Sequence, residues 1–282
     1  MSGIGLLVSH AWGWSEYTSA ALYVVYSQAK RERPYGFYMV DADGSDQQWT
    51  LTAGSPEMLT TLNCSPDGRT LAYLTDRNHL YVVNQNGLLY DRSLDQPHTA
   101  LNVANNGTVA LFDLSQVKQG DSALIDASHA QPLVPPDGNI YESVEPSSLG
   151  TALWNRADYS GVRVTGLSGE TLASFARVDA PKWFASEQII TYDDIGALPA
   201  QRVLADPVTH KLFRLSSGMI RGVFSPDGTR RATNVIEPGT ANVQIIVTDA
   251  LSDEHVEQLT HSSGVIYIPV CFLTFRPQML IS

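Results

Sequence analysis

The tetrapeptide Ser-Pro-Asp-Gly occurs twice in this chain of 282 residues, at 65–68 and at 225–228. Proline presets φ at the first central position, the aspartate side chain can bond its own backbone, and glycine tolerates positive φ, so the tetrapeptide favours a tight turn. Apolar, β-prone residues flank both copies, which predicts a strand–turn–strand unit at each. Ser65 and Ser225 are 160 residues apart, four times 40. A 40-residue period of short strands is typical of a β-propeller with one four-stranded blade per repeat.

Weaker copies of the same turn fill the interval between the two clear ones. They lie at Val103–Phe112, which carries an Asn-Gly turn, at Ser147–Trp154 and at Phe184–Tyr192, with outer copies at Trp14–Val24 and Phe275–Ser282. The second half of each repeat reads as a hairpin, with Asp-Gly or Asn-Gly turns between alternating apolar strands. We therefore expect an all-β fold, a β-propeller of four-stranded blades. Seven blades with an incomplete last blade is the favoured count, and six blades is the alternative.

The ends of the chain bear on how such a ring would close. Phe275–Ser282 begins another repeat and stops inside it, so we expect one propeller domain over residues 1–282, truncated within its last repeat. A closed ring needs its last blade completed by strands from the opposite terminus, and residues 4–9 are a candidate strand. The run Gly3–Val8 is too short for a membrane helix and has no preceding Lys or Arg, so no signal peptide and no membrane insertion are predicted.

Composition limits the classes of partner. The formal net charge is −11, which argues against nucleic acid and against an anionic membrane surface, because both need clustered Lys and Arg. Hydrophobic residues make up 43% of the chain and charged residues 17%, enough to bury a sizeable core. The two cysteines, Cys64 and Cys271, give no disulfide framework, and we expect both to be buried free thiols.

Three runs resemble a known family. "SPDGRTLAYLTD", followed by "LYVVNQNG", and "YMVDADGSDQQWTLT" are similar to TolB-type, WD40-like propeller repeats, which also occur in the N-terminal propellers of prolyl-oligopeptidase-class serine peptidases. The resemblance is specific in three repeats and only periodic in the others, and it spans nearly the whole chain. It implies a periplasmic or extracellular bacterial protein, although the chain shows no export signal.

A search for catalytic and metal-binding patterns finds no candidate. The sequence has no Gly-x-Ser-x-Gly elbow, so a peptidase would need a catalytic domain beyond Ser282. The seven histidines show no His-x-His or His-Glu-x-x-His spacing. Asp41–Asp46 looks like the opening of a calcium loop but lacks its length and its final Glu. We predict no catalytic residue, no metal ligand and no cofactor, and we favour a protein that is not an enzyme.

Binding is expected on the face that carries the loops between second and third strands and the connections between blades. The loops between second and third strands hold a large share of the 18 Lys and Arg residues, and Arg on one face suits a protein interface or an anionic ligand. The candidate binding residues are Arg31, Arg33, Arg77, Arg156, Asp193 and Asp194. The leading hypothesis is a monomeric, non-enzymatic TolB-like propeller that acts as a protein-interaction scaffold for another protein or peptide. The alternatives are the substrate-gating propeller of a serine peptidase that lacks its catalytic domain, and, less favoured, a glycan-binding or glycan-cleaving propeller.

Overall fold

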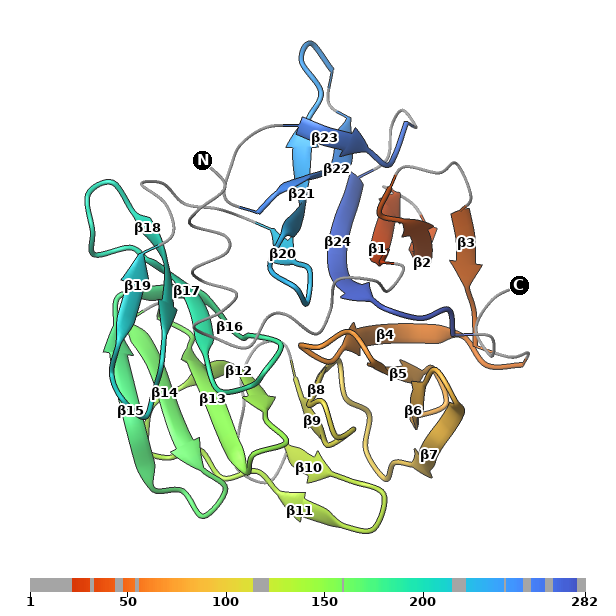
Figure 1. Ribbon diagram of the computed structural model, residues 1–282. Helices are drawn as coiled ribbons and strands as arrows, with labels where there is room; N and C mark the ends of the chain where they lie inside the picture. Colours follow the sequence, from red (N-terminus) through yellow and green to blue (C-terminus); the bar gives the residue numbers. More distant parts are fainter. Residues whose placement is uncertain are drawn as a thin grey trace. The chain divides into compact units, whose positions relative to one another are not determined.

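The computed structural model describes residues 22–30, 33–43, 48–53, 56–113, 122–158, 160–214, 222–240, 242–250, 255–261 and 266–277. Within these ranges all regular secondary structure is β-strand, which confirms the all-β prediction (Figure 1). The chain divides into two compact units, residues 60–220 and a second unit made of residues 1–59 with 221–282. Each unit is described by itself.

The unit of residues 60–220 contains four separate four-stranded antiparallel sheets, each built from strands consecutive in the sequence. We number these blades 1 to 4. The strands are, in blade 1, β4 (Leu59–Cys64), β5 (Thr70–Thr75), β6 (His79–Asn84) and β7 (Gly87–Ser93); in blade 2, β8 (Ala100–Val103), β9 (Val109–Phe112), β10 (Ala123–Ile125) and β11 (Ala130–Pro132); in blade 3, β12 (Tyr141–Pro146), β13 (Thr151–Arg156), β14 (Gly161–Gly166) and β15 (Thr171–Ala176); and in blade 4, β16 (Val178–Trp183), β17 (Ile190–Asp194), β18 (Gln201–Ala205) and β19 (Leu212–Arg214).

The Ser-Pro-Asp-Gly tetrapeptides form the predicted tight turns, each between a first and a second strand. The backbone N–H of Gly68 donates to the carbonyl of Ser65 at 2.9 Å, and the Ser65 hydroxyl donates to Asp67 Oδ1 at 2.6 Å. The turn at 225–228 has the same two bonds, at 2.8 and 2.6 Å. Both glycines have φ of +67°, a conformation that glycine adopts without strain. The local sequence therefore sets the same backbone geometry in both copies.

The three weaker copies adopt the same turn between first and second strands. The fourth N–H donates to the first carbonyl at 2.9 Å over residues 104–107, at 3.3 Å over 147–150 and at 2.7 Å over 184–187. Gly107 and Gly150 hold the fourth position with positive φ, and Glu187 holds it at +55°, where a non-glycine residue is uncommon. The repeat pattern predicted for this part of the chain is confirmed, including the copy that has lost its glycine.

Apolar side chains fill the layers between successive blades. One buried cluster joins blades 1 and 2 around Leu80 and Leu111, a second joins blades 2 and 3 around Tyr141 and Trp154, and a third joins blades 3 and 4 around Trp183. Burying an aromatic or aliphatic side chain of this size contributes about 1.5–3 kcal/mol. Packing between sheets thus holds each blade against its neighbour in sequence.

The second unit contains one eight-stranded sheet. Its strand order is β20-β21-β22-β24-β1-β2-β3, with β23 paired to β22. The antiparallel pair of β24 and β1 includes Val24 opposite Phe272, so strands from the two ends of the described chain share one sheet. The strand bounds are β1 (Tyr23–Lys30), β2 (Arg33–Asp41), β3 (Gln48–Leu51), β20 (Val223–Phe224), β21 (Arg230–Ile236), β22 (Val243–Asp249), β23 (His255–Gln258) and β24 (Ile266–Leu273). The candidate strand at residues 4–9 lies outside the described residues.

The prediction of free thiols is wrong. Cys64 and Cys271 are each 8% exposed, so the expected burial is confirmed, but both are disulfide-bonded. Two lone cysteines far apart in sequence carry no spacing signal for a bond, because the bond depends on where the fold places them.

The disulfide state gives a direct prediction. Protein purified without reductant and unfolded in denaturant is expected to show no reactive thiol, and two thiols after reduction, in a colorimetric thiol assay. Reduction is also expected to lower the free energy of unfolding by about 2–4 kcal/mol, because a cross-link restricts the unfolded chain. Two reactive thiols before reduction would contradict the bonded state.

Candidate functional site

The structure describes most, but not all, of the predicted binding residues. Arg31 lies outside the described residues, and for Arg33 only its backbone position at the start of β2 is described. Arg77 is exposed in the turn between β5 and β6, next to Asn78 with φ of +57°. Its position between a second and a third strand is the one expected from the sequence.

Arg156 is the last residue of β13 and belongs to a charged cluster. Its guanidinium lies 3.6 Å from Asp137 Oδ2, and Arg163 reaches the same oxygen at 2.8 Å. The Tyr141 hydroxyl donates to Asp137 Oδ1 at 3.0 Å. Burial works against ionisation of Asp137, but hydrogen bonds from Asn139 and Tyr141 and the charge of Arg163 hold its pKa below the ordinary value. Two cations thus share one carboxylate, which leaves this cluster with a surplus positive charge.

The prediction placed Asp193 in a loop on the binding face, but Asp193 lies in strand β17 and is buried. Its side chain is 1% exposed and forms a bidentate ion pair with Arg202, with Oδ1 2.9 Å from Nε and Oδ2 3.1 Å from Nη2. The two residues face each other across β17 and β18, and Arg202 is also buried. Asp194 ends β17 half-buried and accepts the backbone N–H of Gly196 at 3.0 Å. The sequence prediction placed Asp193 on a surface that it does not reach.

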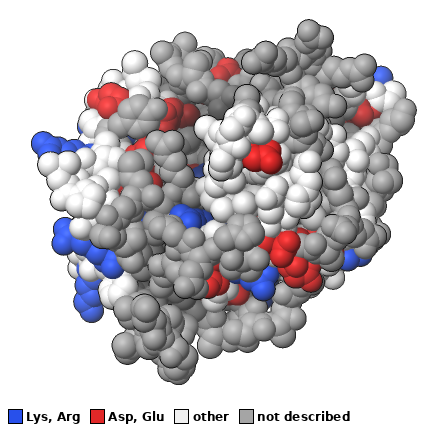
Figure 2. Space-filling model, turned by 90° about the horizontal axis from the view of Figure 1, so that it is seen from above, with Lys and Arg blue, Asp and Glu red and all other residues white. Residues whose placement is uncertain are grey.

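Charged side chains of the described residues do not form a single patch on the face seen in Figure 2. Lys and Arg lie in several groups, with Asp and Glu among them. The charged residues described on the face drawn in Figure 2 are therefore of both signs.

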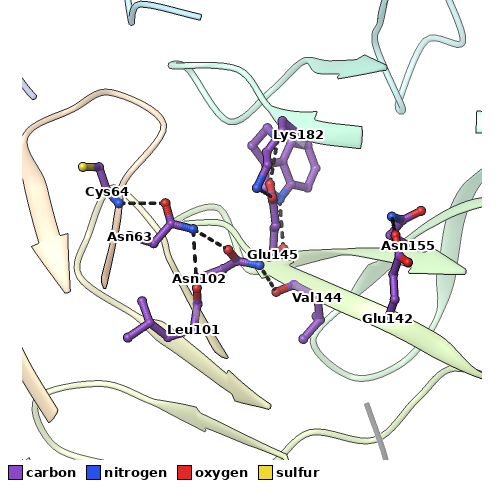
Figure 3. Close-up of polar contacts among 10 residues, drawn as sticks. Asn63, Cys64, Leu101, Asn102, Glu142, Val144, Glu145, Asn155 and Lys182 are labelled. Carbon is purple, nitrogen blue, oxygen red and sulfur yellow. Dashed lines mark hydrogen bonds and ion pairs between the residues drawn. The ribbon is translucent and has the colours of Figure 1, made fainter. Parts of the chain in front are cut away.

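The first strands of blades 1, 2 and 3 are joined by side-chain amides (Figure 3). Asn63 on β4 donates through Nδ2 to Asn102 Oδ1 on β8 at 2.7 Å. Asn102 in turn donates through Nδ2 to the carbonyl of Val144 on β12 at 2.9 Å. A side-chain amide can both donate and accept, so Asn102 links blade 1 to blade 3. Its Oδ1 and its Nδ2 both have partners, although Asn102 is only 6% exposed.

Glu145 continues this connection from blade 3 to blade 4. Its carboxylate forms an ion pair with Lys182 and accepts the backbone N–H of Trp183 at 3.0 Å. The indole N–H of Trp183 donates to the Glu145 carbonyl at 3.0 Å. Lys182 keeps half of its side chain exposed, whereas the Glu145 side chain is 10% exposed. The first strands of all four blades are thus linked by polar groups.

A second acidic residue on these strands, Glu142, belongs to a group with an unsatisfied hydrogen-bond acceptor. Glu142 on β12 accepts a hydrogen bond from Asn155 Nδ2, and the two lie apart from the Glu145 pair in Figure 3. Asn155 is 5% exposed, and its Oδ1 has no hydrogen-bond partner in the described part of the chain. Burial raises the pKa of Glu142, and the charge of Asp179 on β16 raises it further. This set therefore has more acceptors than donors.

The turns between first and second strands are tied together by Glu187. Its carboxylate accepts the backbone N–H of Asn105 at 2.7 Å, the backbone N–H of Ser148 at 2.6 Å, and the Ser148 hydroxyl. Asn105 donates to the carbonyl of Ala185 at 2.7 Å and accepts the backbone N–H of Asp67 at 3.0 Å. Burial raises the pKa of Glu187 and outweighs its hydrogen bonds, which lower it. One side chain of blade 4 thus fixes the turns of blades 2 and 3.

Glu142, Asn155, Asp179 and Glu187 were not identified from the sequence. Nothing in the local sequence marks the first three, because their proximity depends on strand pairing. Glu187 did carry a signal, since it holds the turn position that is glycine in four other repeats.

The described residues include neither a metal-binding cluster nor a membrane-spanning helix. They contain no group of three or more His, Cys, Asp and Glu side chains placed to hold a metal ion. Nor do they include a helix with the length and apolar character needed to cross a membrane.

Comparison with known proteins gives structural matches only. No family model and no curated protein matches the sequence. The crystal structure of TolB from Acinetobacter baumannii superposes with a TM-score of 0.58 at 13% identity, covering 94% of this chain and 70% of that one. A chain from the crystal structure of a nidogen/laminin complex gives a TM-score of 0.57 at 8% identity, covering 90% of this chain and all of that one. The chain has a TolB-like β-propeller fold, which confirms the resemblance seen in its repeats.

Proposed function

We propose that this protein is a non-enzymatic TolB-like β-propeller that acts as a protein-interaction scaffold. Its docking surface is the loop face, which we define as the loops between second and third strands of blades 1, 3 and 4 together with the connections between blades 1 to 4. Because the four strands of a blade alternate in direction, these segments all leave the same end of their sheets. A partner that contacts this end would meet loops from several blades at once.

The observation that carries the proposal is the apolar exposure of these loops. Ile140, in the connection from blade 2 to blade 3, is 55% exposed, and Leu198, in the loop between β17 and β18, is 97% exposed. Ile195 of the same loop is 38% exposed, and Arg77 is exposed in blade 1. Large apolar residues and arginine are both enriched in the contact surfaces of protein interfaces. The net charge of −11 makes nucleic acid a poor alternative.

Site-specific photocrosslinking tests the proposal in cells that express the protein. A photoreactive amino acid at position 140 or 198 is expected to give a discrete conjugate with another protein. Position 149 is the matched control, because Leu149 is 56% exposed but lies in the turn between β12 and β13, at the other end of blade 3. R77E is expected to reduce the conjugate. Equal conjugates from 140 and 149, or none from any position, would count against a docking role for the loop face.

The compartment is part of the proposal. We infer a periplasmic or extracellular location, because disulfides persist in oxidising compartments and both cysteines are bonded. The likeness to TolB repeats points the same way. We also infer that the protein works as a monomer.

We infer one propeller domain of six blades, the alternative weighed from the sequence. The eight-stranded sheet supports it, since it divides into β20–β23 and a second group of four, β24 with β1, β2 and β3.

A further inference from the structure

We propose that Glu142, Asn155 and Asp179 form a binding site for an alkylammonium group, carried either by a lysine side chain of a docked partner or by a small free amine. The inference rests on the proposed docking role, because it names the chemistry that a partner would present to the blades. All three residues lie near the strand ends from which the loops of the loop face depart, at the start of β12, the end of β13 and the start of β16.

Strand irregularities bring the two acids into place. In blade 3, Tyr141 pairs with Arg156 and Ser143 pairs with Asn155, so Glu142 is the extra residue of a bulge. In blade 4 the register shifts between Asp179 and Lys182, and Ala180 has φ of +47°. A bulge bends its strand and redirects a side chain that would otherwise follow the pleat. Both first strands thus depart from regular pairing beside the proposed site.

Asn155 supplies the observation that points to a ligand. It is 5% exposed, and its Nδ2 donates to Glu142, while its Oδ1 finds no hydrogen-bond donor among the described residues. A buried acceptor without a donor is unfavourable, and native structures rarely leave one so. Because Oδ1 and Nδ2 belong to one amide, a donor that reaches Oδ1 also lies close to the Glu142 carboxylate. The missing group is therefore a donor placed between them.

The charge around the site specifies what kind of donor fits. Glu142 and Asp179 are acids, close enough for the charge of Asp179 to act on Glu142. The neighbouring cations already contact other acids, since Lys182 pairs with Glu145, and Arg156 lies 3.6 Å from Asp137, which it shares with Arg163. An ammonium group has three N–H donors, one positive charge and no acceptor. It would satisfy Asn155 Oδ1 and reduce the repulsion between the two carboxylates.

Titration with defined amines tests the site on the full chain. The probes are n-butylammonium and the blocked peptide acetyl-Gly-Lys-Gly-amide, with acetyl-Gly-norleucine-Gly-amide as the uncharged control, and the readout is the NMR shift of the Asn155 side-chain amide. The lysine peptide is expected to bind saturably and at least about tenfold more tightly than the norleucine peptide. Binding of butylammonium as well would assign recognition to the ammonium group, and binding of the peptide alone would assign it to a peptide ligand. Both results support the site.

The variants fix the location of binding. E142Q is expected to weaken lysine-peptide binding at least about tenfold, and D179N is a second variant should E142Q fold poorly. E170Q is the matched control, because Glu170 is an exposed acid of blade 3 in the turn between β14 and β15. Equal binding of the lysine and norleucine peptides, or full binding by E142Q and D179N, would overturn the inference. Photocrosslinking from position 140 tests the docking role independently of the amine titration. A conjugate from position 140 without amine binding would contradict the amine site alone.

Discussion

Asp193→Ala is expected to lower the free energy of unfolding of the blade-forming unit by about 3–5 kcal/mol, because it leaves the Arg202 guanidinium charged and buried without its carboxylate. Both side chains are almost fully buried, at 1% and 3% exposure, and they are held by two contacts at 2.9 and 3.1 Å. Arginine cannot lose its proton at accessible pH, so Arg202 has no way to become neutral. Urea denaturation followed by tryptophan fluorescence measures the loss.

Two further variants separate the ion pair from other effects of mutation. Asp194→Ala removes the adjacent acid, which is half-buried and accepts one backbone bond from Gly196, so a loss of about 0.5–1.5 kcal/mol is expected. The double variant Asp193→Leu with Arg202→Met replaces the pair with apolar groups and is expected to recover most of the stability. A loss for Asp193→Ala no larger than that for Asp194→Ala would show that the pair is not a determinant of stability.

Glu187→Ala is expected to have the next largest effect, a loss of about 1.5–3 kcal/mol. The carboxylate accepts the backbone N–H groups of Asn105 and Ser148, and hydrogen bonds to a charged group contribute about 1.5–3 kcal/mol. Asn105 is partly buried and Ser148 is exposed, so water can replace part of this contribution in the variant. Thermal or urea denaturation of the variant measures this directly. A change below about 1 kcal/mol would mean that water or a relaxed turn replaces Glu187.

The same residue predicts a pH dependence with a defined sign. Burial raises the folded-state pKa of Glu187 above its ordinary value of 4.5, so the folded chain holds this proton more firmly than the unfolded chain. Its contribution to stability is therefore greatest below pH 4.5 and is lost as the pH rises through the raised pKa. Burial raises the pKa of Asp67 in the same direction.

Comparison of wild type with Glu187→Gln isolates this contribution. Because glutamine does not titrate, the stability of the variant is expected to fall less steeply with rising pH over that interval. Glu170→Gln is the control of opposite sign, because a hydrogen bond from Ser168 lowers the pKa of Glu170. A group with a lowered folded-state pKa stabilises the protein less as the pH falls. The stability of Glu170→Gln is therefore expected to decrease less steeply than that of wild type as the pH is lowered. Identical pH profiles for wild type and Glu187→Gln would contradict the assignment.

The turns of this protein could be predicted from its sequence because their chemistry is local. Ser65, Asp67 and Gly68 bond within one turn, so the tetrapeptide alone specifies their geometry, and the same holds for the copy at 225–228. The repeat at 184–187 was found by its spacing alone, although Glu187 stands in the glycine position. Strand order within each blade followed from the same turns.

The site residues depend on pairing that no local pattern encodes. Asp193 beside Asp194 reads as a solvated loop pair until β17 is placed against β18, which brings Arg202 opposite Asp193. Glu142 meets Asn155 only because a bulge adds one residue to β12. The bonded state of Cys64 and Cys271 likewise has no signal in the residues around either cysteine. Charge and residue type in the sequence indicated a binding face. They could not indicate which of its charged side chains already form ion pairs within the protein, as Asp193 does with Arg202 and Arg156 with Asp137.

The order in which strands are synthesised has a consequence for how the chain acquires its structure on the ribosome. Each sheet of blades 1 to 4 draws on strands consecutive in the sequence, so its hydrogen-bonded neighbours emerge within a short stretch of translation. Strand β1 is different, because its partner β24 is made last among the described strands. The early hairpin of β1 and β2 must therefore keep one edge unpaired throughout elongation, a state prone to wrong pairing. Nascent chains of this protein are expected to need protection at their oldest strand while the middle of the chain is already folding.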